Sequence, residues 1–120
     1  MSKHGAHWLE REDHDAISVV RFKTPKVLDE DTLRTVFELI YSMVADVGRN
    51  QLVLNLAAAD FLPSMAMGKL VMLNRKIQAA SGRLALCNLA PAVAESLENT
   101  RLNQLFKIYA TEAEALQSFT

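Results

Sequence analysis

The hydroxyl of Ser64 stands where a loop turns into a predicted helix, in the stretch DFLPSMAMGKL at residues 60–70. The first amide N–H groups of a helix lack intrahelical partners and the helix dipole is positive there. A phosphoserine, with about −1.5 to −2 charges, would be tolerated at this position, whereas the same charge in an apolar interface would be strongly unfavourable. Serine is also a favoured helix N-cap, worth ~1 kcal/mol. Two roles therefore stay open for Ser64: phosphate acceptor, or helix cap only.

Other residue types that could support chemistry lack the required spacing. His4, His7 and His14 gather near the N-terminus, but no cysteine accompanies them and no helical i, i+4 pair is evident. A metal site needs fixed ligand geometry, so we expect exposed histidines and no bound metal. Cys87 lies inside an apolar run, where burial raises a thiol pKa, and we expect a core residue rather than a nucleophile.

The acidic and glycine-containing segments also favour a protein without an active site. The cluster DEDT at residues 29–32 is typical of a solvated helix start. The glycines stand alone, at Gly5, Gly48, Gly68 and Gly82, so there is neither a P-loop nor a GxGxxG pattern. We therefore expect a non-enzymatic protein, with no catalytic residue and no cofactor.

Length and composition indicate one soluble domain. The chain has 120 residues, 50% of them hydrophobic, and a net charge of −1. That length is ordinary for one domain, and the balanced charge gives no support to direct nucleic-acid binding. No apolar run reaches the ~18 residues of a membrane span. The start lacks a secretory apolar segment, and the single cysteine cannot form an internal disulfide. We expect one cytoplasmic domain over residues 1–120, with residues 1–6 as a flexible tail.

Hydrophobic periodicity predicts alternating strands and helices. Apolar, β-branched or partly alternating runs predict strands at residues 7–13, 15–23, 51–57, 83–89 and 105–110. Apolar residues at offsets of three and four predict helices from Asp31 to about Val47, from the quoted loop to about residue 80, and at 91–100 and 111–119. The continuous apolar run at 51–57 favours a strand covered on both faces.

Capping residues mark the predicted helix ends. Expected helix starts are Asp29 or Asp31, Pro91, and Thr111 with Glu114 as a capping box. Gly48 and Gly82 are expected to end the first and second helices. The order β-β-α-β-α-β-α-β-α predicts an α/β fold with about four helices. Its mixed, mostly parallel sheet should have about five strands, with the first strand or two at an edge.

From Leu52 to Leu116 the chain resembles a STAS domain, the fold of bacterial anti-sigma factor antagonists. AAADFLPSMAMGKL stands for the family's signature loop, in which an Asp-Ser-Ser/Thr-Gly turn opens a helix. ASGRLALCNLAPAVAESLENTRLNQLFKIY stands for the segments that follow it. The resemblance covers roughly the last two thirds of the chain, and the first third agrees in element order.

The resemblance places Ser64 at the family's phosphorylated serine. Pro63, Met65 and Ala66 replace the aspartate, the second hydroxyl and the glycine, so the loop is degenerate, while Gly68 matches a later small residue. It implies an antagonist that binds an anti-sigma factor of the serine-kinase type and frees a sigma factor. Phosphorylation at Ser64 would be the switch, and ATP would belong to the kinase.

Apolar residues around Ser64 suggest where a partner would make contact. We expect Leu62 and Met67 to turn into the core and Met65 to be exposed, because methionine suits adaptable binding surfaces. The partner contact is therefore predicted at Asp60, Leu62, Met65, Met67 and Gly68.

Two other functions stay open at this stage. One is a constitutive STAS scaffold, or a self-associating domain such as a homodimer, in which Ser64 is only the helix N-cap. The other is a small nucleotide- or lipid-binding domain, since helix N-termini accept anions. The second is disfavoured because the chain has neither a glycine-rich loop nor a basic pocket.

Overall fold

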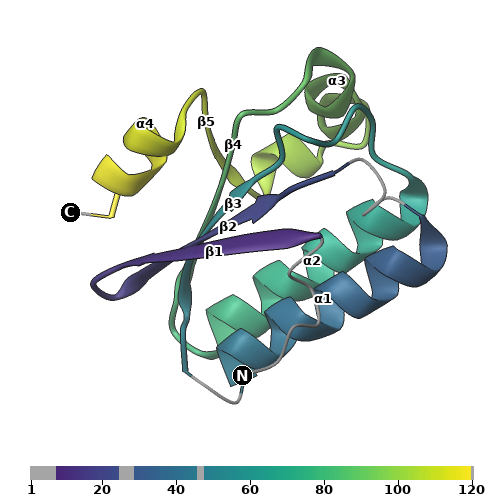
Figure 1. Cartoon of the computed structure of the whole chain (residues 1–120). Coiled ribbons are helices and arrows are strands. Elements are labelled where there is room, and N and C mark those ends of the chain that lie inside the picture. Colours follow the sequence, from purple (N-terminus) through teal and green to yellow (C-terminus); the bar gives the residue numbers. More distant parts are fainter. Residues whose placement is uncertain (1–7, 25–28, 46–47, 120) are drawn as a thin grey trace.

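The computed structural model describes residues 8–24, 29–45 and 48–119 of the chain (Figure 1). The tail predicted for residues 1–6 and the predicted helix end at Val47 lie outside these ranges. In chain order the elements are β1 (Leu9–His14), β2 (Ile17–Phe22), α1 (Glu30–Ala45), β3 (Gln51–Asn55), α2 (Ser64–Ala79), β4 (Arg83–Cys87), α3 (Pro91–Asn99), a 3-10 turn η2 (Leu102–Gln104), β5 (Lys107–Tyr109) and α4 (Glu112–Gln117). The predicted order of strands and helices is confirmed; only the 3-10 turn was not expected.

A single five-stranded sheet forms the centre of the described structure, with strand order β1-β2-β3-β4-β5. β1 pairs with β2 in antiparallel fashion, and the remaining pairs are parallel. Val19, Val53 and Ala85 lie side by side across the three central strands. The predicted mixed, mostly parallel sheet is therefore confirmed, with β1 at one edge and β5 at the other.

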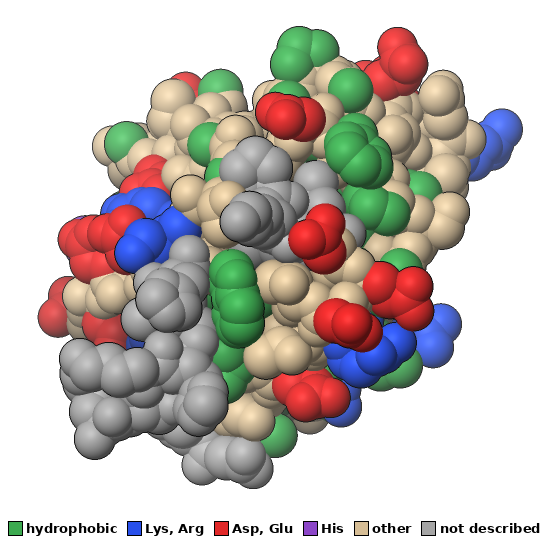
Figure 2. Space-filling view, turned by 45° about the vertical axis from the view of Figure 1, so that its right-hand side comes forward, with side chains coloured by type: hydrophobic (Ala, Val, Ile, Leu, Met, Phe, Trp, Pro, Cys, Tyr) green, Lys and Arg blue, Asp and Glu red, His purple; other side chains and the backbone are tan. Residues whose placement is uncertain are grey.

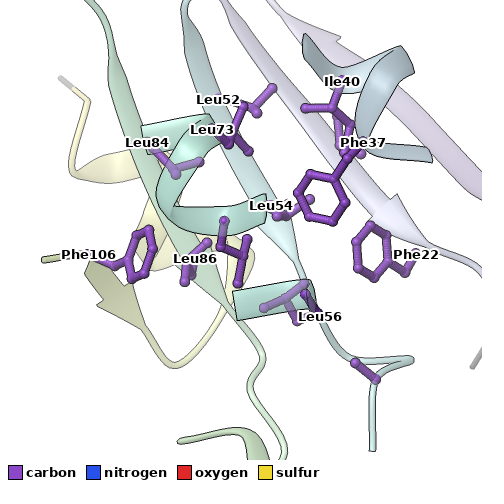
Figure 3. Close-up of a cluster of buried hydrophobic side chains, with 14 of the residues drawn as sticks. Phe22, Phe37, Ile40, Leu52, Leu54, Leu56, Leu73, Leu84, Leu86 and Phe106 are labelled. Atoms are coloured by element: carbon purple, nitrogen blue, oxygen red, sulfur yellow. The ribbon is translucent and has the colours of Figure 1, made fainter. Parts of the chain in front are cut away.

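The main core lies between the sheet and the helices α1, α2 and α3. Figure 1 shows α1 and α2 side by side along one side of the sheet, with α4 on the opposite side. Leu52 and Leu54 of β3 point toward the helices, where Leu73 of α2 meets them (Figure 3). Phe22 and Phe37 stack edge to face, with ring centroids 6.3 Å apart.

A second, smaller cluster covers the other face of the sheet. It joins the central strands to α4 and consists of Val19, Val53, Ala85, Cys87 and Ala115. Leu52, Val53 and Leu54 have no exposed surface, so β3 is covered on both faces as its apolar run predicted.

Gly48 follows the described part of α1, which extends to Ala45. Its φ of +75° is the left-handed conformation that glycine adopts without strain. The next residue, Arg49, donates its amide to the Met43 carbonyl at 2.9 Å and satisfies one of the last carbonyls of the helix.

Gly82 acts differently from the prediction. The left-handed residue after α2 is Ser81, at φ +59°, and Gly82 follows it, donating to the Ile77 carbonyl at 2.8 Å. A Cβ at Gly82 would lie 1.9 Å from the carbonyl oxygen of Asn50. Glycine is therefore required here by close backbone packing and not by its own φ angle.

The predicted starts of the last two helices are confirmed. Pro91 is the first residue of α3. The Thr111 hydroxyl accepts the Glu114 amide at 3.2 Å, while the Glu114 carboxylate accepts the amide of Ala110 at 3.2 Å. The capping box thus forms, although its carboxylate reaches one residue further back than the usual pattern.

In the described ranges no helix is both long and apolar enough to cross a membrane.

Candidate functional site

The loop between β3 and α2, residues 56–63, presents Ser64 at the carboxyl end of the parallel strands. Its first residue, Leu56, donates its amide to the Cys87 carbonyl at 3.1 Å, which ties the loop to β4. Ala59 donates to the Leu56 carbonyl at 2.9 Å and closes a turn. Ala59 and Leu62 are both buried in the main core. Backbone hydrogen bonds and apolar anchors therefore hold the loop in one position.

Ser64 is the first residue of α2 and is exposed. The N-cap is Pro63, at φ −62° and ψ 157°, and its carbonyl accepts the amide of Met67 at 3.1 Å. Within the described part of the chain no side chain makes a capping hydrogen bond to this helix start. Of the two roles that the sequence leaves open for Ser64, the structure does not show the helix cap. Proline occupies the extended cap position, and the serine hydroxyl stays free at the surface.

The start of α2 is electrostatically different from two other helix starts. α1 and α4 carry acidic residues in their first turns, at Glu30, Asp31, Glu112 and Glu114. Residues 64–67 of α2 include no acidic side chain. The amide N–H groups of residues 64–66 have no partner within the helix, and no acidic side chain of the first turn offsets their positive potential. The nearest acidic residue in the sequence is Asp60, in the loop. A negative charge on Ser64 would be favourable to the fold at this point.

The predicted contact residues divide between surface and core. Asp60 and Gly68 are exposed. Met65 and Met67 are half-buried and pack against the main core, so Met65 is less exposed, and Met67 less buried, than we expected. Leu62 is only 6% exposed and offers almost no surface to a partner. Its burial fixes the loop from inside.

Two exposed apolar residues beside Ser64 were missing from the predicted contact set. Phe61 is 54% exposed and Met72 is 44% exposed. Met72 follows Gly68 by four positions, as Gly68 follows Ser64, so the three share one side of α2. That spacing was a sequence signal for Met72, whereas Phe61 had no such signal. We call Asp60, Phe61, Ser64, Gly68 and Met72 the Ser64 face.

Figure 2 shows hydrophobic and acidic side chains interspersed over one side of the molecule, with its basic side chains mainly in two small groups. No broad basic area is visible on this side among the coloured residues. One cavity lies beside α3 and β5 and another lies between α2 and β4, and neither is lined by residues 60–72. The Ser64 face is therefore not part of either cavity.

Gly68 is not required by the fold. Among the described residues, a Cβ added there would meet no heavy atom within 4 Å. Glycine inside a helix is less favourable than alanine by ~1 kcal/mol. Packing within the described residues therefore gives no reason for glycine at position 68. The missing side chain leaves the helix surface flat beside Ser64.

A polar group on the second face of the sheet was not predicted from the sequence. The guanidinium of Arg21 donates to both carboxylate oxygens of Glu112, at 2.5 and 2.8 Å. The Asn55 side chain also donates to Glu112, at 2.6 Å. The hydrogen bond from Arg21, opposed by burial, lowers the pKa of the Glu112 carboxyl below its ordinary value.

The remaining candidates for chemistry behave as core or surface residues. Cys87 is buried, and burial raises the pKa of its thiol to about 12, as expected of an inert core cysteine. His14 lies on β1, with its Nε2 2.9 Å from a carboxylate oxygen of Glu12, whereas His4 and His7 fall outside the described residues. Within the described ranges no group of three or more His, Cys, Asp or Glu side chains could hold a metal ion.

Comparison with known proteins assigns this fold to a family. The sequence model of the STAS domain matches residues 9–115. A candidate anti-sigma factor antagonist from Thermotoga maritima is similar at a TM-score of 0.86 and 22% identity, covering 96% of this chain and 97% of that one. An anti-sigma factor antagonist from Mycobacterium paratuberculosis is similar at a TM-score of 0.78 and 29% identity, over 92% and 91% of the two chains.

A third similar structure contains a phosphorylated protein. It is the Bacillus cell fate determinant SpoIIAA in its phosphorylated form, with a TM-score of 0.72 and 21% identity, covering 93% of this chain and 99% of that one. No curated protein sequence matches the chain.

Proposed function

The chain belongs to the STAS domain family, and on this premise we propose that it is a non-enzymatic anti-sigma factor antagonist. It binds an anti-sigma factor of the serine-kinase type in the cytoplasm and is switched by phosphorylation of Ser64. The observation that carries the proposal is the exposed Ser64 hydroxyl at the start of α2, a helix whose first turn contains no acidic residue.

The chemistry requires nothing from this chain except an acceptor. The partner kinase holds ATP and transfers its terminal phosphoryl group to the Ser64 oxygen, which loses its proton to the kinase. The phosphate then lies at the amides of the first turn of α2, where a helix stabilises negative charge. The fold of this chain should therefore be the same in both states.

The change occurs in the interface. The unmodified Ser64 face offers Phe61 and Met72 as exposed apolar side chains, with Gly68 as a flat approach between Ser64 and Met72. Half-buried Met65 and Met67 contribute their exposed parts, and Asp60 lies at the rim. A doubly charged group in the middle of this surface loses its hydration when the partner closes over it, so phosphorylation releases the partner.

The relatives support the proposal through their described roles. Two of the similar structures are described as anti-sigma factor antagonists, one of them as a candidate, and a third is a phosphorylated form. Their identity to this chain, at 21–29%, is low enough that the partner and the switch must be tested directly.

A constitutive STAS scaffold is the second candidate, because the loop departs from the family pattern. Pro63, Met65 and Ala66 stand where the resemblance places an aspartate, a second hydroxyl and a glycine. A kinase would meet a proline at the position before the acceptor. In this alternative the same face binds a partner or a second copy permanently, and Ser64 is an unmodified surface residue.

Substitutions at Ser64, tested with the partner that co-purifies with the chain, show whether this face is the interface. We expect Ser64→Ala to bind as the wild type does and Ser64→Glu to lose affinity by about 100-fold, as for a charge buried without a partner. Equal affinity of both variants would place the interface elsewhere and contradict both candidates. Adding ATP to the wild-type complex distinguishes the two, because the switch predicts a phosphate on Ser64 and release of the partner, whereas the constitutive scaffold predicts an unmodified, intact complex. Isothermal titration calorimetry measures the affinities, and circular dichroism checks that the variants are folded.

A further inference from the structure

Asn55, the last residue of β3, uses both ends of its side-chain amide. The nitrogen donates to the Glu112 carboxylate at 2.6 Å, on the side of α4. The oxygen accepts the backbone amide of Ala57 at 2.8 Å, on the side of the Ser64 loop. One side chain thus connects the last helix with the first residues after the sheet.

The orientation of this amide is determined by its two neighbours. A carboxylate can only accept a hydrogen bond and a backbone N–H can only donate one. If the Asn55 amide were turned over, its oxygen would face the Glu112 carboxylate, which is also an acceptor, and its NH2 group would face the Ala57 N–H, which is also a donor. Glu112 is itself held by two nitrogens of Arg21, Nε and Nη2. The Glu112 and Arg21 side chains are only 22% and 25% exposed. Asn55 is therefore fixed at both ends.

The bond to Ala57 acts where the chain leaves the sheet toward Ser64. Leu56 is tied to Cys87 and Ala59 to Leu56, whereas the intervening residue, Ala57, is exposed and has its amide bound by Asn55. Without this bond, the turn at residues 56–59 keeps its two backbone hydrogen bonds and the buried side chain of Ala59, but the Ala57 amide loses its partner.

We infer that Asn55 is a positioning residue for the Ser64 loop and that it couples the geometry of this loop to α4 through Glu112. The inference rests on the proposed function, since it concerns the loop that presents Ser64 to the partner. It adds a partner-independent claim: the order of residues 57–62 depends on a donor–acceptor pair on the opposite face of the sheet.

The test exchanges donor and acceptor between the two residues. Asn55→Asp keeps an acceptor for Ala57 but places a second carboxylate against Glu112. The double variant Asn55→Asp with Glu112→Gln restores a donor–acceptor pair with the net charge of the wild type. Glu10→Gln serves as the matched control, because Glu10 contacts Arg21 at 3.2 Å but neither Asn55 nor Glu112.

The first readout is hydrogen–deuterium exchange of residues 57–62, followed by mass spectrometry. At neutral pH we expect Asn55→Asp to speed exchange there by about tenfold, the size of one lost charge-assisted hydrogen bond. The double variant should return to within about threefold of the wild type, and Glu10→Gln should match it. Exchange in α1, which lacks contact with this group, should be unchanged in all variants.

The single variant should also acquire a pH dependence. Two carboxylates at hydrogen-bond distance raise the pKa of one of them, and the protonated group can then donate. Acidification should therefore raise the protection factor of the loop, which corrects for the slower intrinsic exchange of all amides at lower pH, in Asn55→Asp and not in the double variant. Arg21, Glu10, Glu12 and His14 also face this group, so the Glu10→Gln control is followed over the same pH range.

The second readout is affinity for the partner, measured beside thermal stability. We expect Asn55→Asp to weaken binding or Ser64 phosphorylation by about tenfold and the double variant to recover it. Loop exchange that does not change in Asn55→Asp, or that rises equally in α1, would overturn the inference. If the double variant restores loop exchange but the affinity for the partner is the same in all variants, the functional part of the inference is overturned.

The outcome for the proposed function is separate. If the wild type binds no partner and is never phosphorylated, the proposed function fails, and the exchange pattern alone decides whether Asn55 positions the loop.

Discussion

The side chains of Asn55 and Glu112, 57 positions apart in the sequence, are joined by a hydrogen bond of 2.6 Å between amide and carboxylate. The bond attaches α4 to the end of β3, beside the loop that carries Ser64. α4 has six residues, too few for a helix to be stable by itself in water. Its attachment therefore depends on this polar group and on the packing of Ala115 against the sheet.

Stability at acid pH should depend on Glu112. Its folded-state pKa is lowered, chiefly by the hydrogen bond from Arg21, so the stabilisation is fully present above the ordinary value of 4.5 and is lost as the pH falls through the lowered pKa. Urea unfolding at a series of pH values should show this loss in the wild type and a smaller one in Glu112→Gln. Glu95→Gln, at an exposed carboxylate of α3, is the control. An identical slope in all three proteins would contradict the prediction.

Gly68→Ala should separate stability from binding. Alanine in the middle of α2 should raise the free energy of unfolding by up to ~1 kcal/mol, because the added methyl group enters open space. The same methyl group would protrude from the flat surface beside Ser64 and should weaken partner binding by about tenfold, the effect of a modest steric overlap. Urea unfolding and calorimetric titration measure the two effects. A stabilised variant with full affinity would remove Gly68 from the interface.

Gly82→Ala should have the opposite effect on stability. Its Cβ would lie 1.9 Å from the carbonyl oxygen of Asn50, a backbone atom that cannot move without disturbing β3. We expect a loss of about 2 kcal/mol or more. Gly68→Ala is the matched control, measured by the same urea unfolding. A loss no larger than that of an ordinary surface substitution would show that the Gly82–Asn50 contact is not tight.

Phe61 and Leu62 are neighbours with predicted opposite roles. Phe61→Ala should leave the free energy of unfolding within ~0.5 kcal/mol, since its ring is largely exposed, but should weaken partner binding. Leu62→Ala should cost about 2–5 kcal/mol of stability, because it removes a buried side chain. Thermal unfolding and calorimetric titration of both variants check the pair. Full partner affinity in folded Phe61→Ala would place the interface elsewhere.

The order of elements was predictable because its signals are local. The apolar run at β3 and the three- and four-residue offsets in α1 are each contained in one short segment. The start of α3 at Pro91 and the capping pair of Thr111 and Glu114 are likewise local patterns. The ends of elements were predicted less well. The strand expected at 105–110 is reduced to Lys107–Tyr109. Leu105 and Phe106 are not in the strand and donate their amides to the Leu102 carbonyl of η2 instead.

The details of the site depended on longer-range relations. Both Pro63 and Ser64 suit a helix start, and the sequence could not decide which one would adopt the extended cap conformation. Gly82 was assigned to a helix end because Asn50, which approaches it closely, lies before β3 in a distant part of the sequence. The group of Arg21, Asn55 and Glu112 was not predicted at all, since its members lie 57 and 91 positions apart and meet only after the sheet and α4 have assembled.

The phosphorylation state of Ser64 in native cells tests the central claim most directly. The tagged chain is purified under mild conditions at several stages of growth, and the chain and its partners are analysed by intact-mass and peptide mass spectrometry. The proposed function predicts a single phosphate on Ser64 in part of the population and a co-purified ATP-binding serine kinase bound to the unmodified part. An unmodified Ser64 under every condition, with a partner still bound, would contradict the switch and leave a constitutive scaffold.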